Sequence, residues 1–314
     1  MSARLDVAIE RWPVAGSFTI ARGAKTHVDV VVVTLTDGGV VGRGEATPIY
    51  YHGESAESVA AQLRSGETLG RGAARNALDC ATWDLRAKQS GIPVWQGAGL
   101  EAPRPLTTAY TISLGDPDRM RADAAKAAAL YPLLKLKLSG EGDLARVAAV
   151  RAGAPEARLI VDANEAWTGR DVVAEATALL PFGVELIEQP VRAGEDALLD
   201  GLRSPIPLCA DESCQDRSDL ARCIGRYQAI NIKLDKAGGL TEALALAVDA
   251  RGAGLELMVG CMLSTSLGVA PAFLVAQAAR WVDLDGPLLL AGDRDPAMRF
   301  EGATMQPPDA ALWG

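Results

Sequence analysis

The sequence has few of the residues and patterns on which several common kinds of site depend. It has only two histidines, His27 and His52, both in its N-terminal part. No G-x-x-x-x-G-K-[ST] sequence occurs, so nucleotide binding through a phosphate loop is not expected. No apolar run approaches the roughly 18 residues that a membrane-spanning helix needs, so we predict no membrane partner.

Cysteines are few and positive charge is outweighed. The five cysteines are scattered and form no C-x-x-C pair, so we expect reduced core residues in a cytoplasmic protein. A net charge of −9 argues against nucleic acid as a partner, because phosphate binding needs clustered lysine and arginine. The segment Met1–Pro13 is charged and has no apolar core, so it is not expected to be a signal peptide. The composition, 49% hydrophobic and 23% charged, is ordinary for a soluble globular protein.

Three predicted strands end in an acidic residue at nearly equal intervals. Each apolar stretch is typical of a strand that is buried on both faces. The acids lie 26 and then 23 residues apart, which is about one strand, one returning helix and two loops. In a parallel array, this spacing places the same strand end on the same face. The stretches and their acids are 159–161 with Asp162, 184–187 with Glu188, and 206–210 with Asp211.

The three acids have two explanations. A single acid at the end of a strand commonly caps the next helix. Three acids at matching positions would repel one another, so a bound cation is the natural partner. Carboxylate ligands with room for water suit Mg²⁺ better than Zn²⁺.

Two lysines extend the same spacing on both sides of the acids. Lys137 ends the predicted strand 133–137, and Lys233 ends the predicted strand 229–233. One interpretation makes both lysines counter-ions for the acids. In a closed barrel they would instead face each other across the acids, where they could carry protons on opposite faces of a substrate.

The first hundred residues follow a different pattern from the rest. Residues 28–36 and 40–46 flank Asp37-Gly38-Gly39, which predicts a hairpin in an antiparallel meander. We expect a loop at 18–23, a packed helix without chemistry at 73–85, and a linker at 91–105. From residue 106, strands and helices alternate, which predicts a parallel barrel with its site at the carboxyl ends of the strands. The expected strands are 106–112, 133–137, 159–162, 184–188, 207–210, 229–233, 256–260 and 280–283.

Six motifs, in one order and spacing, carry a resemblance to a known family. They are Lys135-Leu136-Lys137, Val161-Asp162-Ala163-Asn164, Ile187-Glu188-Gln189-Pro190, Ala210-Asp211-Glu212-Ser213, Ile232-Lys233-Leu234-Asp235-Lys236 with Gly238-Gly239, and Asp283-Leu284-Asp285-Gly286-Pro287. With them the chain resembles the dipeptide epimerases of the enolase superfamily, in the muconate-lactonising-enzyme subgroup, and most closely the L-Ala-D/L-Glu epimerases. The resemblance implies an α/β fold, a modified TIM (β/α)7β barrel with an α+β capping domain. It implies a cap at 1–104, a barrel at 105–286 and a tail at 287–314 that returns to the cap.

The resemblance also implies an isomerase activity. The family epimerises a dipeptide at the α-carbon of its C-terminal residue, here most naturally L-Ala-L-Glu to L-Ala-D-Glu and back in murein peptide metabolism. The enediolate that forms when the α-proton leaves is stabilised by Mg²⁺. The implied Mg²⁺ ligands are Asp162, Glu188 and Asp211, and the implied acid/base pair is Lys137 and Lys233. With both histidines outside the barrel, a relative that uses a histidine as second base is excluded.

Further residues are implied to bind the substrate. Asp283 and Asp285 lie on one face of the last strand and would hold the α-ammonium group of a dipeptide. Arg22 in the cap would recognise an acidic side chain, or is a surface arginine. The remaining candidates are Thr111 and Lys135 for carboxylate groups, Cys261 for a backbone contact, one of Tyr50, Tyr51 and His52 as a pocket wall, and Lys236 as a helper or a surface charge.

Other functions stay open. An N-acylamino acid racemase or a cycloisomerase of the same superfamily would not need Asp283 and Asp285. An acid-sugar dehydratase would need an additional acid, for which the sequence offers no candidate. A binding protein without catalysis is the remaining alternative, and a homo-oligomer is possible for any of them.

Overall fold

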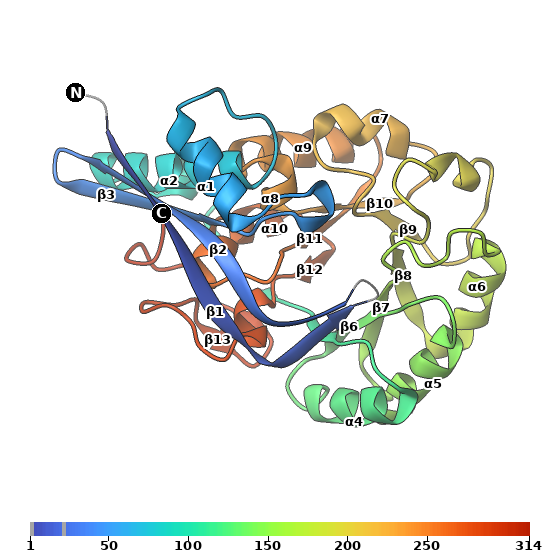
Figure 1. Ribbon diagram of the computed structural model, residues 1–314. Coiled ribbons are helices and arrows are strands. Elements are labelled where there is room, and N and C mark those ends of the chain that lie inside the picture. The colour runs from blue at the N-terminus through green and yellow to red at the C-terminus, as the bar shows by residue number, and fades with distance from the viewer. Residues whose placement is uncertain (1–2, 21–22) are drawn as a thin grey trace.

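The computed structural model describes residues 3–20 and 23–314 and divides the chain between a cap and a barrel (Figure 1). An antiparallel sheet of three strands lies beside a parallel sheet of eight strands, and a small third sheet involves the C-terminal tail. This architecture confirms the predicted α/β fold with a capped barrel, whereas the limits of the three predicted domains stay a prediction. Within the described residues, no helix is both long and apolar enough to cross a membrane.

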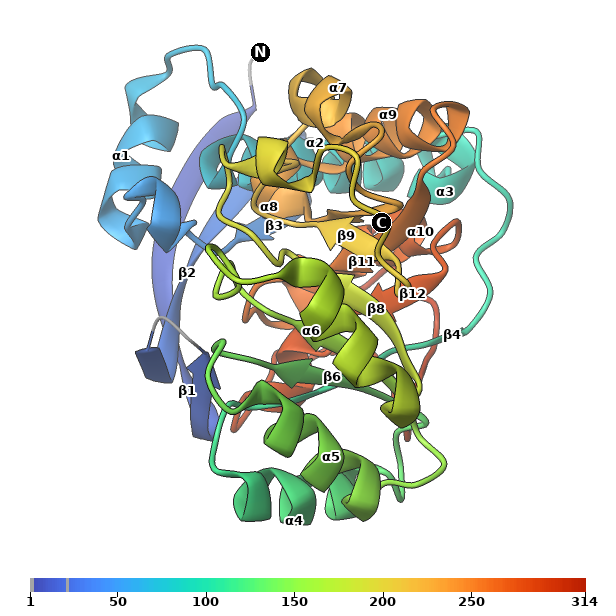
Figure 2. The same ribbon diagram turned by 90° about the vertical axis from the view of Figure 1, so that its right-hand side faces the viewer.

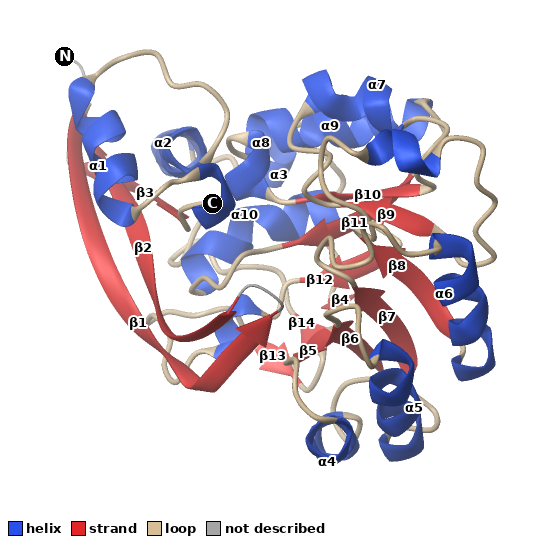
Figure 3. Ribbon diagram, turned by 45° about the vertical axis from the view of Figure 1, so that its right-hand side comes forward, coloured by secondary structure: helices blue, strands red, loops and turns tan. Residues whose placement is uncertain are grey.

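The cap is built on a long hairpin. Strand β1 (Arg4–Ile20) pairs with β2 (Gly23–Asp37), which pairs with β3 (Val40–Ala46). Gly38 and Gly39 connect β2 to β3 with φ values of 57° and 83°, so the two-residue turn needs glycine or a similarly tolerant residue. The two long strands curve from the cap toward the barrel strands (Figure 3).

The predicted loop at 18–23 is wrong in part. Phe18, Thr19 and Ile20 continue β1 and pair with Lys25, Ala24 and Gly23 of β2. Aromatic and β-branched residues favour a strand, which explains why the hairpin continues through this segment.

Helices cover one face of the cap sheet and lead into the barrel. They are α1 (Ala56–Ser65), α2 (Ala73–Ser90) and the short α3 (Val94–Gly97), preceded by a 3₁₀ turn at Tyr50–His52. Ser55 begins α1 with a capping box formed with Ser58. The helix expected at 73–85 therefore forms, and the expected linker at 91–105 contains one helical turn.

The barrel consists of strands that run in sequence order around the sheet. They are β5 (Tyr110–Ile112), β6 (Leu133–Lys137), β7 (Arg158–Asp162), β8 (Val184–Glu188), β9 (Leu208–Ala210), β10 (Ala229–Ile232), β11 (Glu256–Gly260) and β12 (Trp281–Asp283). The Ala109 amide donates to the Val282 carbonyl at 2.7 Å, which brings the two edges of the sheet together. The expected strands are thus present, although the first is interrupted after β4 (Leu106–Thr107).

The connecting helices lie on the outside of the sheet, as Figure 2 shows for α4, α5 and α6. Their bounds are α4 (Pro117–Ala127), α5 (Asp143–Gly153), α6 (Val172–Leu179), α7 (Leu220–Cys223), α8 (Leu234–Ala237), α9 (Leu240–Gly252) and α10 (Ser266–Ala276). The tail begins with a 3₁₀ turn at Gly286–Leu289. A hairpin follows, β13 (Phe300–Glu301) with β14 (Thr304–Met305), and pairs with β4. The chain end lies on the cap, where Trp313 donates to the Cys80 carbonyl at 3.0 Å.

A layer of buried residues fills the inside of the barrel and sets the depth of the site. Each of the eight strands, or the residue just before it, contributes one member: Ala109, Leu133, Ile160, Leu186, Cys209, Ala229, Met258 and Trp281. This packed layer lies toward the amino ends of the strands. The charged residues that end β6, β7 and β8 lie beyond this layer, at the carboxyl ends of the strands.

Candidate active site

The three predicted acids meet at the carboxyl end of the barrel. Asp162 and Glu188 are the last residues of β7 and β8 and are partners in register, and Asp211 directly follows β9. All three are at most 2% exposed. Burying three carboxylates side by side is costly unless positive charge lies among them.

Three lysines supply this charge in the structure. Lys137 lies 2.6 Å from Asp162, and Lys233 lies 2.7 Å from Asp211. The Lys135 ammonium lies 2.6 Å from Glu188 and 2.8 Å from Asp283, and 3.4 Å from Asp162. The structure thus brings the predicted acids and lysines together, with Lys135 in their midst.

The pKa values of the acids and of Lys233 depend on burial and on the charges that surround each group. Burial favours the neutral form of each acid, but Lys137 and Lys135 lower the pKa of Asp162 to about 2. Burial raises the pKa of Glu188 to about 7, with Asp162 adding to the effect, and Lys135 only partly opposes it. Burial alone would lower the pKa of Lys233, yet Asp211 and Glu188 raise it well above its usual value.

The acid trio fits a hard divalent cation by its chemistry. Three buried carboxylates offer oxygen donors only, which is the ligand type that Mg²⁺ prefers. Across residues 3–20 and 23–314, no three acidic, cysteine or histidine side chains are arranged so that they could hold a metal ion as they stand. The reason is visible in the ion pairs, because each carboxylate faces a lysine ammonium at 2.6–2.7 Å. Asp162, Glu188 and Asp211 would hold the cation once these contacts reorganise.

One loop residue, Gln189, and a further lysine, Lys236, hold Asp211 in place. Gln189 has a φ of 37° and accepts hydrogen bonds from the Asp211 amide at 2.8 Å and the Ser213 amide at 3.1 Å. The fully buried Lys236 donates to Asp211 Oδ1 at 2.7 Å, so its interpretation as a surface charge is wrong. A strained backbone angle beside buried acids is typical of a functional site.

Sequence analysis missed Asn231, which donates to Glu188 Oε1 at 2.7 Å. Asn231 lies on β10 two positions before Lys233, which directly follows the strand in an extended conformation, so the two side chains lie on the same face. The period-two rule that linked Asp283 to Asp285 could have found this residue.

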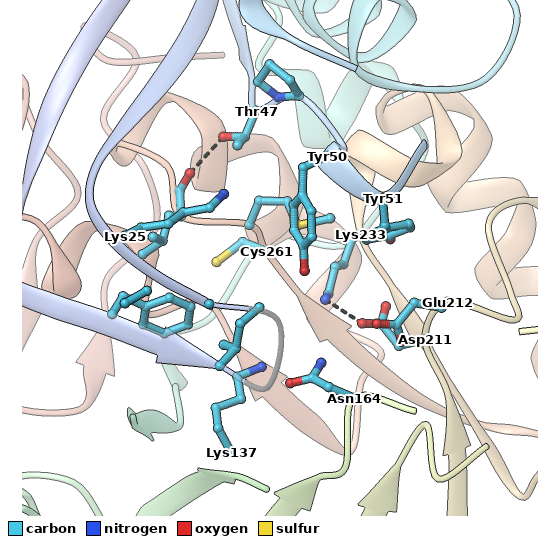
Figure 4. A pocket seen from close by; sticks show the side chains of 17 residues that line it. Lys25, Thr47, Tyr50, Tyr51, Lys137, Asn164, Asp211, Glu212, Lys233 and Cys261 are labelled. Carbon is cyan, nitrogen blue, oxygen red and sulfur yellow. Dashed lines mark hydrogen bonds and ion pairs between the residues drawn. The ribbon is translucent and has the colours of Figure 1, made fainter. Parts of the chain in front are cut away.

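A cavity of about 260 Å³ lies between the acids and the cap (Figure 4). Lys137 and Lys233 both line it, from strands on either side of the acid trio. Tyr50 and Tyr51 of the cap also line it, whereas His52 is not among its lining residues, which settles the choice of wall left open by the sequence.

A smaller chamber of about 30 Å³ continues from this cavity and shares both lysines with it. Asp283, Asp285, Thr111 and Cys261 line the chamber. The Thr111 amide donates to Asp285 at 2.7 Å, and the Cys261 thiol lies 3.5 Å from the Asp283 carbonyl oxygen. Burial, with help from Asp283, raises the pKa of Asp285 to about 7.

One predicted site residue cannot be placed. Arg22 lies outside the described residues, so its predicted role in recognising an acidic side chain stays a prediction.

Family models match most of the barrel and part of the cap. Residues 119–311 match the enolase C-terminal domain-like model, and residues 54–99 match the mandelate racemase/muconate lactonizing enzyme N-terminal domain model. The matched segments include every predicted metal ligand and both candidate catalytic lysines.

Two curated relatives cover nearly the whole chain. An L-Ala-D/L-Glu epimerase of Escherichia coli strain K12 is 44% identical, over 93% of this chain and 95% of that protein. An N-acetyl-D-glutamate racemase of a Pseudoalteromonas species is 43% identical, over 91% of this chain and 95% of that protein.

Solved structures of relatives share the fold. An enolase family member from Agrobacterium tumefaciens, with sodium and L-Ala-L-Glu bound, is 50% identical with a TM-score of 0.95, over 99% of this chain and all of that one. A dipeptide epimerase from Enterococcus faecalis V583, complexed with Mg and L-Leu-L-Tyr, is 29% identical with a TM-score of 0.90, over 98% of each chain. A cation and a dipeptide are therefore present together in both of these related structures.

Proposed function

Since the chain belongs to the dipeptide epimerases of the mandelate racemase/muconate lactonizing enzyme group of the enolase superfamily and is an isomerase, we propose that it interconverts L-Ala-L-Glu and L-Ala-D-Glu with Mg²⁺ as its cofactor. The proposal extends to a role in murein peptide metabolism in the cytoplasm. The observation that carries it is the pair Lys137 and Lys233, which reach one cavity from either side of three buried acids.

Two opposed lysines suit inversion at a carbon. With the α-carbon of the C-terminal residue between them, one lysine removes the proton from one face and the other delivers a proton to the opposite face. A divalent cation held by Asp162, Glu188 and Asp211 would supply positive charge for the enediolate that forms as the proton leaves. Asp211 and Glu188 raise the Lys233 pKa, and their charge would be offset in the loaded enzyme, so Lys233 could release its proton more readily.

The smaller chamber supports a dipeptide with a small first residue. Asp283 and Asp285 line it and offer negative charge to an α-ammonium group. Its volume of about 30 Å³ leaves space for a small side chain such as that of alanine. The carboxylate of the second residue would then face the acid trio and its cation.

Proton NMR of L-Ala-L-Glu with the protein and Mg²⁺ in D₂O tests this proposal. We expect loss of the glutamyl α-proton signal together with signals of the L-Ala-D-Glu diastereomer. Exchange without inversion would mean that only one lysine reaches the carbon. No exchange would refute the Ala-Glu assignment, and other dipeptides would be screened next.

The Pseudoalteromonas relative favours a second candidate, racemisation of N-acetylglutamate. An N-acylated substrate has no α-ammonium group, so it gains nothing from Asp283 and Asp285. The double variant Asp283→Asn with Asp285→Asn separates the two functions. It should lose most activity on L-Ala-L-Glu if the protein is a dipeptide epimerase, and should keep its activity on N-acetyl-L-glutamate if it is a racemase.

A further inference from the structure

Lys25 places a positive charge in the larger cavity, and the proton transfers proposed above do not involve it. It belongs to β2, pairs in register with Phe18, and lines the same cavity as Lys137 and Lys233 (Figure 4). Its side chain is half-buried, and its ammonium lies 4.7 Å from the centre of the Tyr50 ring. Burial lowers the pKa of Lys25, although Asp29 partly offsets this effect. The cost of removing the Lys25 ammonium from water is therefore only partly compensated by the attraction of Asp29.

No acidic side chain in the described part of the chain forms an ion pair with Lys25. The acid that acts on its charge, Asp29, is held by Arg11 through two hydrogen bonds of 2.7 and 2.8 Å. The lysines deeper in the site differ, because Lys137 and Lys233 each contact a carboxylate within 2.7 Å. Lys25 thus presents a positive charge to the cavity that a bound anion could neutralise.

The division of the cavity indicates which part of the substrate reaches Lys25. The larger cavity and the smaller chamber share Lys137 and Lys233, so the reacting carbon lies where they join. The chamber with Asp283 takes the amino-terminal residue, and the acid trio faces the carboxylate. The larger cavity toward Lys25 is left for the side chain of the residue that is inverted.

We propose that Lys25 is a specificity-determining residue that binds the carboxylate of an acidic side chain on the inverted residue. The inference rests on the proposed function and deepens it. Phe18, Ile20 and Met262 line the same cavity and would cover the methylene groups of a glutamate side chain. A side chain of this kind combines an apolar stem with a terminal anion. Among the described residues, the cavity likewise combines apolar walls with the Lys25 ammonium, which no carboxylate contacts there.

The test compares L-Ala-L-Glu with L-Ala-L-Gln, which differ in charge and hardly in shape. Equilibrium binding with Mg²⁺ present and kcat/KM for epimerisation are measured for the wild type and for Lys25→Met, Lys25→Arg and Lys126→Met. Lys126→Met is the matched control, because Lys126 is an exposed lysine on α4 outside this cavity. We expect Lys25→Met to weaken L-Ala-L-Glu binding by about 10- to 100-fold and to raise KM more than it lowers kcat, since a charge-assisted hydrogen bond to the side chain is lost. L-Ala-L-Gln should be affected little, and Lys25→Arg should restore the preference for glutamate.

The outcomes separate this inference from the proposed function. If Lys25→Met binds L-Ala-L-Glu as tightly as the wild type does, or weakens both ligands equally, the inference is overturned while epimerisation stands. Loss of discrimination in Arg22→Met but not in Lys25→Met would also overturn it. If the wild type binds L-Ala-L-Glu selectively without inverting it, the proposed function fails, and the binding data on Lys25→Met still decide the role of Lys25.

Discussion

Replacing Gly260 by alanine should impair catalysis by crowding one side of the site. Gly260 ends β11 and is buried, and a Cβ atom there would lie 2.8 Å from Asn231 Oδ1 and 3.2 Å from Lys233 Cε. Ordinary contact begins near 3.4 Å, so Asn231 would have to move by about 0.6 Å and Lys233 by about 0.2 Å. Asn231 also donates to Glu188 at 2.7 Å, so the shift would reach a candidate metal ligand.

The expected size of the effect follows from these displacements. A misplacement of about 1 Å can cost about 10²-fold in rate, so we expect kcat/KM for epimerisation to fall by about 10- to 100-fold in Gly260→Ala. Overpacking should destabilise the fold by about 1–3 kcal/mol, which leaves the protein folded at 25 °C. Circular dichroism and thermal unfolding would check the fold, and NMR in D₂O would check the chemistry.

Exchange of the α-proton in D₂O distinguishes an effect on Lys233 from a general loss of activity. The methyl group crowds Lys233 and not Lys137, so α-proton exchange catalysed by Lys137 should persist while inversion slows by about 10- to 100-fold. The matched control is Gly252→Ala at the exposed end of α9, where a Cβ atom meets nothing within 4 Å. If Gly260→Ala inverts the dipeptide at the wild-type rate, or if the folded variant loses exchange equally for both epimers, the methyl group does not act through Lys233.

Three further predictions concern charge. Asp235 has its pKa raised by burial to about 7, so the wild type loses stability as pH rises from about 4 through 7. Asp235→Asn keeps an oxygen that accepts a hydrogen bond from the Thr47 amide. The variant should be more stable than the wild type at pH 8 by up to about 4 kcal/mol. Urea unfolding measures this difference, which should vanish near pH 4. Arg294→Met removes the guanidinium that lies 2.6 Å from the buried Glu45 carboxylate. Urea unfolding at pH 7.5 should show that the free energy of unfolding falls by about 3 kcal/mol. An unchanged unfolding midpoint would contradict this prediction. Lys135→Met removes the ammonium that lies between Glu188 and Asp283, so the acids no longer share their charge with this lysine when Mg²⁺ binds. The rise in melting temperature on adding Mg²⁺ should therefore be larger than in the wild type. An equal or smaller rise would argue against metal binding at these acids.

The positions of the charged residues in the barrel were predictable because strand-end residues repeat with the βα unit. Asp162, Glu188 and Asp211 follow apolar stretches at near-equal spacing, and parallel strands bring their carboxyl ends to one face. The residues that support the acids were harder to predict from the sequence. Lys236 lies on the short helix α8, and its buried ammonium donates hydrogen bonds to the Asp211 and Cys214 carbonyls, which lie far from it in the sequence.

The cap was harder to predict than the barrel. The hairpin turn at Gly38-Gly39 was evident, because two glycines between β-branched runs leave few alternatives. The extension of β1 to Ile20 was not, because the local preference of Phe18, Thr19 and Ile20 for a strand does not identify their pairing partners in β2. The same pairing carries Lys25 into the cavity, and nothing in its local sequence marks it as a site residue.

The parallel barrel, the acid trio and the two lysines follow from the sequence, because they depend on a spacing that repeats along the chain. Which charges meet depends on tertiary structure. It placed Lys135 between Glu188 and Asp283, selected Tyr50 and Tyr51 over His52 as cavity walls, and brought Lys25 to face Lys137 and Lys233. Lys135 and Asp283 are 148 positions apart and meet because the barrel closes, whereas Lys25 reaches the cavity because the cap docks on the barrel. No local pattern encodes either arrangement.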